Sequence, residues 1–179
     1  MKLIHKTLLV AFVSAIILSC SSDDDQPVRE ETQNVLRINN QEFELKTGLY
    51  QTSEIQDGLY AFGVFLYDTE ISIVDGEPIP QDETFTGLAF QLNIDNSDKP
   101  KLGEYLFTGE ENPGLNSIAE AFTISGNAET ASGELIEIEV ARLQVIENEG
   151  AYEFEMTAID EEDNDIEMRF KGKLELITN

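Results

Sequence analysis

The sequence predicts an all-β fold, an antiparallel β-sandwich of about ten strands. From residue 35 to residue 176, short runs of apolar residues alternate with polar ones at a period of two, which is typical of half-buried strands. Turn-forming Gly, Pro, Asn and Asp separate these runs. No stretch of a dozen residues keeps the helical period of 3.6, and only residues 115–119 could form a single helical turn. Loops of unequal length favour the sandwich over a β-barrel.

The first half of the domain opens with a predicted hairpin at residues 35–46. Its strands are expected at 35–38 and 43–46 and its turn at 39–42, because Asn39 and Asn40 tolerate a positive φ. Residues 59–67 are apolar on both faces, which predicts a central strand buried on both sides. Further strands are predicted at residues 71–73, 88–94, 103–107 and 121–124, with loops at 75–83, 110–116 and 126–133.

The C-terminal third has the clearest alternation and one change of phase. Ile138 and Val140 share one parity, whereas Leu143 and Val145 have the other. Since a strand that changes parity must contain an extra residue or a bend, we expect a β-bulge or corner near residues 141–142.

A closing hairpin is predicted from matching apolar patterns at residues 152–156 and 166–170. Its tip, residues 160–165, is the densest acidic cluster of the chain. Clustered carboxylates at a loop are candidate Ca²⁺ ligands, although the spacing is not that of an EF-hand. The alternative is a solvated tip whose charges discourage edge-to-edge pairing. The candidate calcium ligands are Asp160, Glu162, Asp163 and Asp165, and a weaker set, Asp95, Asn96 and Asp98, is interpreted as turn residues.

The N-terminus has the order of a secretory signal. Lys2 and Lys6 precede an apolar run at residues 8–18, which is too short for a membrane span of about 20 residues. Cys20 is the only cysteine and lies where this run ends. A plain signal peptide that leaves an unpaired thiol is the alternative interpretation, but a lone cysteine at this junction favours a modified residue.

The junction resembles two signals of bacterial lipoproteins. Leu18-Ser19-Cys20 resembles a lipobox, although Leu18 replaces the usual Ala or Ser. The resemblance implies cleavage before Cys20 and a diacylglycerol thioether on its sulfur. The following acidic run is similar to the export signal of Bacteroidota-type surface lipoproteins, which implies an outer-membrane anchor facing the cell exterior. The alternatives are an ordinary solvated tether and the periplasmic face. The run comprises Ser21, Ser22, Asp23, Asp24 and Asp25.

These signals divide the chain into three parts: a signal peptide (1–19), a lipidated N-terminus with an acidic tether (20–33), and a single β domain (34–179). The order of the predicted strands is also similar to the small all-β cargo domains, without assigned activity, of Bacteroidota-type lipoproteins.

Composition excludes several classes of function. Residues 1–19 contain two lysines and no acid, so the rest of the chain carries a formal charge of −27, which repels nucleic acid and anionic lipid. His5 is the only histidine and lies in the signal, which excludes Ser-His-Asp and Cys-His catalytic sites and histidine–cysteine zinc sites from the remainder.

We therefore expect a non-catalytic binding or accessory module, without a cofactor unless Ca²⁺ binds, whose partner is a protein or a glycan. The alternatives are a carboxylate-dependent glycan hydrolase and a structural subunit of an envelope complex. The chain has five tyrosines and no tryptophan, and core packing is the expected role of the tyrosines.

Overall fold

The computed structural model describes residues 34–74, 77–96, 98–107 and 114–177. This part of the chain is all-β, as predicted. The signal peptide, the lipidated cysteine and the tether predicted at residues 1–33 lie outside the described residues. The described residues form thirteen strands, β1 (Val35–Ile38), β2 (Gln41–Glu44), β3 (Thr47–Gln56), β4 (Leu59–Tyr67), β5 (Ile71–Val74), β6 (Glu77–Pro80), β7 (Thr84–Ile94), β8 (Gly103–Phe107), β9 (Ser117–Asn127), β10 (Ser132–Glu147), β11 (Tyr152–Asp160), β12 (Asp165–Gly172) and β13 (Glu175–Leu176).

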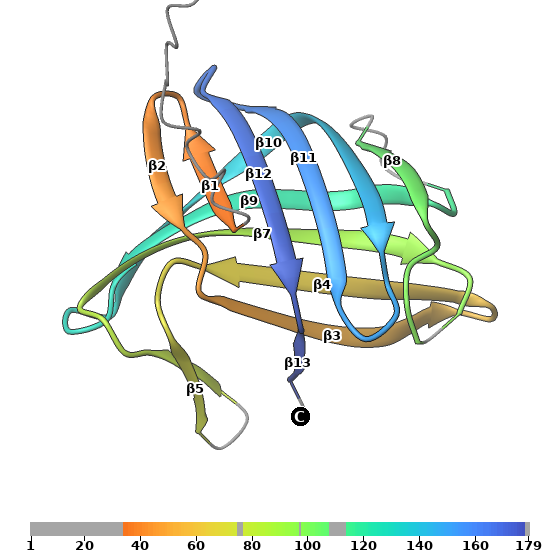
Figure 1. Cartoon of the computed structure of the whole chain (residues 1–179), viewed down its shortest axis with the longest axis horizontal. Coiled ribbons are helices and arrows are strands. Elements are labelled where there is room, and N and C mark those ends of the chain that lie inside the picture. Colours follow the sequence, from red (N-terminus) through yellow and green to blue (C-terminus); the bar gives the residue numbers. More distant parts are fainter. Residues whose placement is uncertain (1–33, 75–76, 97, 108–113, 178–179) are drawn as a thin grey trace, which may run out of the picture. The chain divides into compact units, whose positions relative to one another are not determined.

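Eleven of these strands form one curled sheet in the order β13-β3-β4-β7-β9-β8-β10-β11-β12-β1-β2, and β5 and β6 form a separate two-stranded sheet (Figure 1). The pairing is antiparallel except at β13–β3 and β8–β9, which are parallel. The large sheet has two ends, β13 and β2, and it is open rather than closed into a barrel. The predicted sandwich is therefore built from one mixed sheet that folds over itself.

Strand β10 connects the two crossing layers of the large sheet. Its first half, Ser132–Glu137, pairs with β9, and its second half pairs with β8 on one edge and β11 on the other. The register shifts between Ile138 and Val140, where one extra residue on β10 forms a bulge. Figure 1 shows β3, β4, β7 and β9 running across the view and β11, β12 and β1 crossing them. The predicted corner exists, but it lies about two residues before the expected position, so Val140 is on the outer surface with 58% of it exposed.

The core lies between the two crossing layers. Phe62 on β4 and Phe154 on β11 are both fully buried. The rings of Phe90 and Phe154 meet edge to face with centroids 5.6 Å apart, which joins the layers directly. At one end of the core, Tyr152 lies between Phe154 and Phe62, with ring centroids 5.7 and 5.9 Å away. Burying one such side chain contributes roughly 1.5–3 kcal/mol, so these contacts hold the two layers together.

Both predicted hairpins form, but the turn of the first is two residues shorter than expected, because Gln41 and Glu42 already belong to β2. Asn39 turns between β1 and β2 with a φ of 54°, as its tolerance of positive φ predicted. Phe154 lies opposite Phe170 and Met156 opposite Met168 in the closing hairpin. Strand β4 is central as predicted, with β3 on one side and β7 on the other.

Three segments differ from expectation. β3 was not predicted, because its second half is mostly polar and exposed, although its backbone pairs with β4 along its length. β6 forms inside a predicted loop despite Pro78 and Pro80. The helical turn expected at residues 115–119 is not formed, because Ser117 already begins β9 and pairs with Asn93.

The β5–β6 hairpin is fixed to the large sheet at its base. Thr69 is fully buried, and its hydroxyl accepts a hydrogen bond from the backbone N–H of Asp82 at 3.1 Å. The Asp68 carboxylate accepts the N–H of Thr86 at 2.7 Å. Loss of solvent around Asp68 raises the pKa of its carboxyl above the ordinary value, against the smaller opposing effects of the Thr86 N–H and of Lys46.

Asp68→Asn should raise the melting temperature at pH 7. The pKa of Asp68 is higher in the folded state than in the unfolded state, so protonation stabilises the fold. Stability therefore increases as the pH falls through the folded pKa towards the ordinary aspartate pKa of about 3.9. Above this range the charged carboxylate costs stability. Asn keeps the acceptor for Thr86 without the charge. Thermal unfolding from pH 4 to pH 8 should show a flatter profile for the variant.

The matched control is Asp95→Asn. The hydrogen bond from Lys101 lowers the pKa of Asp95, so this carboxylate contributes stability above its ordinary pKa and loses it as the pH falls. Its replacement should lower the melting temperature at pH 7. Equal shifts of one sign for both variants would contradict the assignment.

Candidate functional site

The acidic tip predicted to bind calcium is organised by Asp160, which points into the protein. Asp160 is 1% exposed. Its Oδ1 accepts the N–H groups of Glu162 at 3.0 Å and Asn164 at 2.9 Å, and its Oδ2 accepts the Asn164 side-chain amide at 2.9 Å. The two carboxyl oxygens therefore serve as the turn's acceptors, which satisfies buried polar atoms that would otherwise be costly.

The other predicted calcium ligands do not join Asp160. Glu162, Asp163 and Asp165 are exposed, and Asp163 has a φ of 61° at the turn. The backbone of Asp165 exchanges hydrogen bonds with Asn39, giving its N–H to Oδ1 at 3.1 Å and accepting the Asn39 N–H at 2.7 Å. Among the described residues, no group of three or more His, Cys, Asp or Glu could hold a metal ion. The geometry gives the calcium prediction no support.

The weaker acidic set forms a turn, as interpreted from the sequence. Asn96 Oδ1 accepts the N–H groups of Asp98 at 2.9 Å and Lys99 at 3.1 Å, which is an Asx turn. Asp95 pairs with Lys101.

Asp160→Ala should destabilise the domain by about 3 kcal/mol, because two backbone N–H groups and one side-chain amide lose the buried carboxylate that accepts them. Urea unfolding monitored by circular dichroism measures the loss. Glu162→Ala, which removes an exposed carboxylate from the same tip, should stay within about 0.5 kcal/mol of wild type. Equal effects of the two substitutions would refute the buried-acceptor role.

A second surface gathers most of the chain's arginines. Three of the four arginines, Arg37, Arg142 and Arg169, lie on the outward side of β1, β10 and β12. The strand register fixes their neighbours. Arg142 is opposite Thr157, and Thr157 is opposite Glu167, which in turn is opposite Arg37. We call this surface the arginine face; it comprises Arg37, Glu104, Leu106, Val140, Arg142, Gln144, Glu155, Thr157, Ile159, Glu167 and Arg169.

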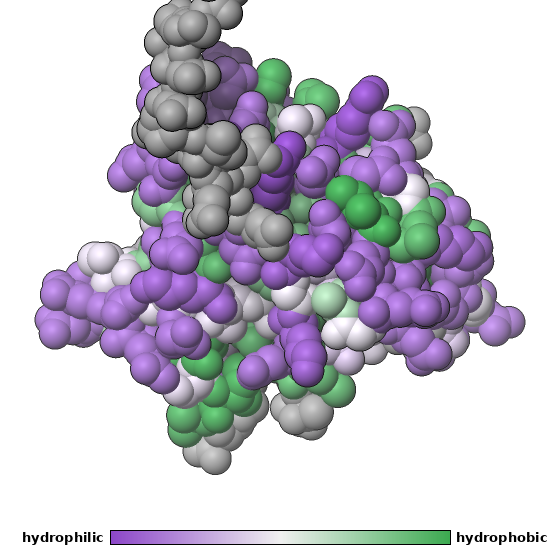
Figure 2. Space-filling view, in the orientation of Figure 1, coloured by the Kyte–Doolittle hydropathy of each residue, from purple (hydrophilic) through white to green (hydrophobic). Residues whose placement is uncertain are grey.

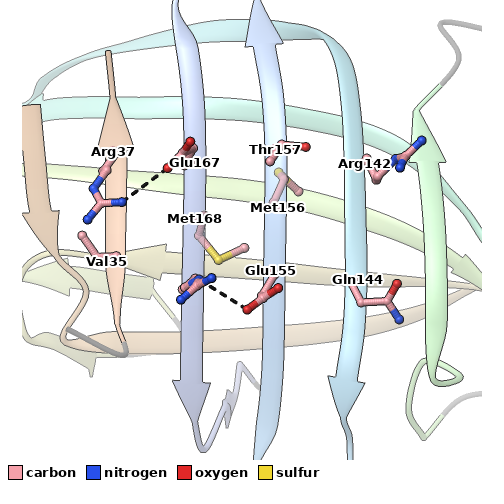
Figure 3. A pocket seen from close by; sticks show the side chains of 10 residues that line it. Val35, Arg37, Arg142, Gln144, Glu155, Met156, Thr157, Glu167 and Met168 are labelled. Carbon is pink, nitrogen blue, oxygen red and sulfur yellow. Dashed lines mark hydrogen bonds and ion pairs between the residues drawn. The ribbon is translucent and has the colours of Figure 1, made fainter. Parts of the chain in front are cut away.

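Glutamates on neighbouring strands hold each arginine in place. Figure 3 shows Arg37 reaching Glu167, at 3.4 Å, and a second pair, Arg169–Glu155, is 3.3 Å apart. Arg142 is 3.2 Å from Glu104. The hydrogen bond to Glu42, at 2.8 Å, is the main cause that raises the pKa of Arg37. These side chains stay 43–67% exposed, so the pairs orient the guanidinium groups and add little to stability.

An apolar margin continues the arginine face. Leu106, Val140 and Ile159 are 42%, 58% and 42% exposed, and Val140 and Ile159 are directly opposite each other across β10 and β11. Two shallow hollows of about 280 and 780 Å³ lie on this surface and share Arg142, Thr157 and Glu167. The space-filling view shows a mostly hydrophilic surface over β11 and β12, with hydrophobic atoms nearby (Figure 2). The face therefore combines fixed guanidinium groups, carboxylates and exposed aliphatic side chains.

Catalytic groups on the described surface are limited to carboxylates, hydroxyls, lysines and arginines. Asp160 is the one buried carboxylate among the described residues. The tyrosines of the core behave as expected: Tyr105 is 1% exposed, and its hydroxyl donates to the Lys101 carbonyl at 3.1 Å, while burial raises its pKa.

Sequence reasoning did not find the arginine face. The parity of the predicted first strand places Arg37 outward, and that of the closing hairpin places Arg169 outward, whereas Arg142 lies at the predicted change of phase, so its side is not fixed by parity. Their convergence depends on the pairing of β1 with β12 and of β10 with β11, which brings together residues more than a hundred positions apart.

No family model matches the sequence, and no curated protein or solved structure matches the chain. In the described part of the chain, no helix has the length and apolar character that a membrane span requires.

Proposed function

We propose that this chain is an exported, lipid-anchored module whose β domain binds a protein partner through the arginine face. The observation that carries the proposal is the concentration of three of the four arginines, together with three exposed aliphatic side chains, on one face of an acidic domain. Arginine is enriched in protein interfaces and lysine is depleted, because a guanidinium group is weakly hydrated and makes several directed hydrogen bonds.

The anchor belongs to the same proposal. Cys20 follows an apolar run with two preceding lysines, and the acidic run at residues 21–25 resembles a surface-export signal. We propose that the lipid on Cys20 holds the domain at the outer membrane, facing the cell exterior, where it acts without catalysis as a binding or accessory module. The thirteen residues at 21–33 would span at most about 45 Å when extended, which leaves the domain room to reach a partner.

A glycan hydrolase is the weaker candidate. Such an enzyme places two carboxyl groups about 5–9.5 Å apart around the scissile bond and raises the pKa of one of them. The buried Asp160 accepts three hydrogen bonds within its own turn, and this use favours a structural role for it.

Cys20→Ala should abolish lipidation. Without the sulfur no thioether can form, so the protein should take up no labelled fatty acid and should keep the mass of the unprocessed precursor. Ser21→Ala is the matched control and should be labelled and processed as wild type. Labelling of Cys20→Ala equal to wild type would refute the anchor.

A photoreactive amino acid at Val140 should give a discrete cross-linked protein on intact cells. The same group at Ser53, an exposed residue of β3 outside the arginine face, is the control and should not give that adduct. Arg142→Glu should weaken the adduct about tenfold, which corresponds to about 1.4 kcal/mol of binding free energy. Identical adducts from both positions, or an adduct that Arg142→Glu leaves unchanged, would contradict the proposed face.

A further inference from the structure

The β5–β6 hairpin is a two-stranded sheet with no third strand among the described residues. It projects from the large sheet at the lower left of Figure 1, and Figure 2 shows that its surface is hydrophobic. Ile73, Val74 and Ile79 are 36%, 53% and 45% exposed. The chain carries a formal charge of −25, and an exposed apolar hairpin does not add to the solubility that this charge provides. Such an apolar surface is typical of a binding site.

The register shows which backbone groups of β5 point outward. The N–H of Gln81 donates to the carbonyl of Glu70 at 3.0 Å, so these two residues form a pair that exchanges ladder hydrogen bonds. Such pairs recur at every second position of an antiparallel hairpin. Ile71 and Ile73 therefore fall in the intermediate pairs, and their N–H and C=O groups point away from β6.

The two edges of the hairpin differ in chemistry. The residues opposite Ile71 and Ile73 are Pro80 and Pro78, so the outward positions of β6 are both prolines. Proline has no N–H, and a strand edge that lacks donors cannot form a second ladder. β6 is therefore closed to strand addition, whereas β5 offers alternating donors and acceptors beside a half-buried Ile71 and an exposed Ile73.

Charge identifies the kind of strand that fits this edge. The hairpin and its base are surrounded by acidic side chains, and Lys46, 3.7 Å from Asp82, is the cation paired there. A second copy of this chain would bring the same negative charges to the contact. An extended segment with alternating apolar and basic residues would pair with both the edge and the charges. The acidic residues are Asp68, Glu70, Glu77, Asp82 and Glu83.

We propose that the outer edge of β5 binds an extended, apolar and basic segment of a partner protein by strand addition. The segment adds a third strand to the β5–β6 sheet, with backbone hydrogen bonds to Ile71 and Ile73. This site is separate from the arginine face, and its test does not depend on that proposal.

The probe is a labelled peptide of alternating lysine and valine, and fluorescence anisotropy measures its binding to the full chain. Ile73→Pro removes one outward N–H without removing a bond between β5 and β6, and it should weaken binding at least tenfold. Thr52→Pro is the matched control. Thr52 has the parity of Tyr50, whose carbonyl points away from β4 and accepts the N–H of Ile177, the residue after β13. The N–H of Thr52 therefore also points away from β4. Thr52→Pro should bind the peptide as wild type does.

Two further measurements keep the result clear if Ile73→Pro disturbs the hairpin. Amide exchange on the wild-type protein should show slower exchange of the Ile71 and Ile73 N–H groups when the peptide is present. A peptide N-methylated on the residues that face β5 should bind at least tenfold more weakly than its parent.

Absence of peptide binding to wild type would overturn the proposal. So would equal binding of the N-methylated peptide, unchanged exchange at Ile71 and Ile73, or a loss of binding in Thr52→Pro alone. A wild-type dimer in sedimentation that Ile73→Pro dissolves would assign the edge to a second copy of this chain and overturn the partner assignment.

Discussion

The bulge of β10 between Ile138 and Val140 is the constraint on which this structure depends. A single open sheet leaves one face in water, and a chain of this size stabilises itself only by burying that face. The first half of β10 pairs with β9 and its second half pairs with β11. β10 therefore belongs to both layers of the folded sheet and connects them around the core. The edge-to-face contact of Phe90 and Phe154 and the contact of Tyr152 with Phe62 follow from this crossing.

The bulge also sets the outer surface. The extra residue reverses the parity of β10, so Leu143 and Val145 enter the core while Val140 and Arg142 point outward. Without this reversal, Arg142 would share a parity with the core residues of β10. The same local irregularity therefore completes the core and places an arginine opposite Thr157, beside the cross-strand pairs of Arg37 and Arg169.

Strand edges are protected by different means in different parts of the fold. β2, at one end of the large sheet, has two glutamates among its four residues, which discourages pairing through charge. At the other end, β13 covers Leu49 and Tyr50 of β3. Proline closes β6. Among the described residues, the outer edge of β5 has neither a covering strand nor a proline. In this it differs from the edges of β2, β3 and β6, each of which is protected.

The sequence by itself determined the fold class, the hairpins at Asn39 and at residues 160–165, the central position of β4 and the existence of a corner in β10, because apolar alternation and turn chemistry are local properties. It also provided the whole basis for the proposed anchor at Cys20, which lies outside the described residues. Tertiary structure alone decided that β3 is a strand, because its hydrogen-bond partner on β4, and not its own polar side chains, fixes it. It decided that Asp160 is a buried acceptor and not a surface ligand, since burial depends on how the hairpin tip packs against the chain. It also decided that Arg37, Arg142 and Arg169 share one surface, because strand order is set by long-range pairing that parity cannot specify.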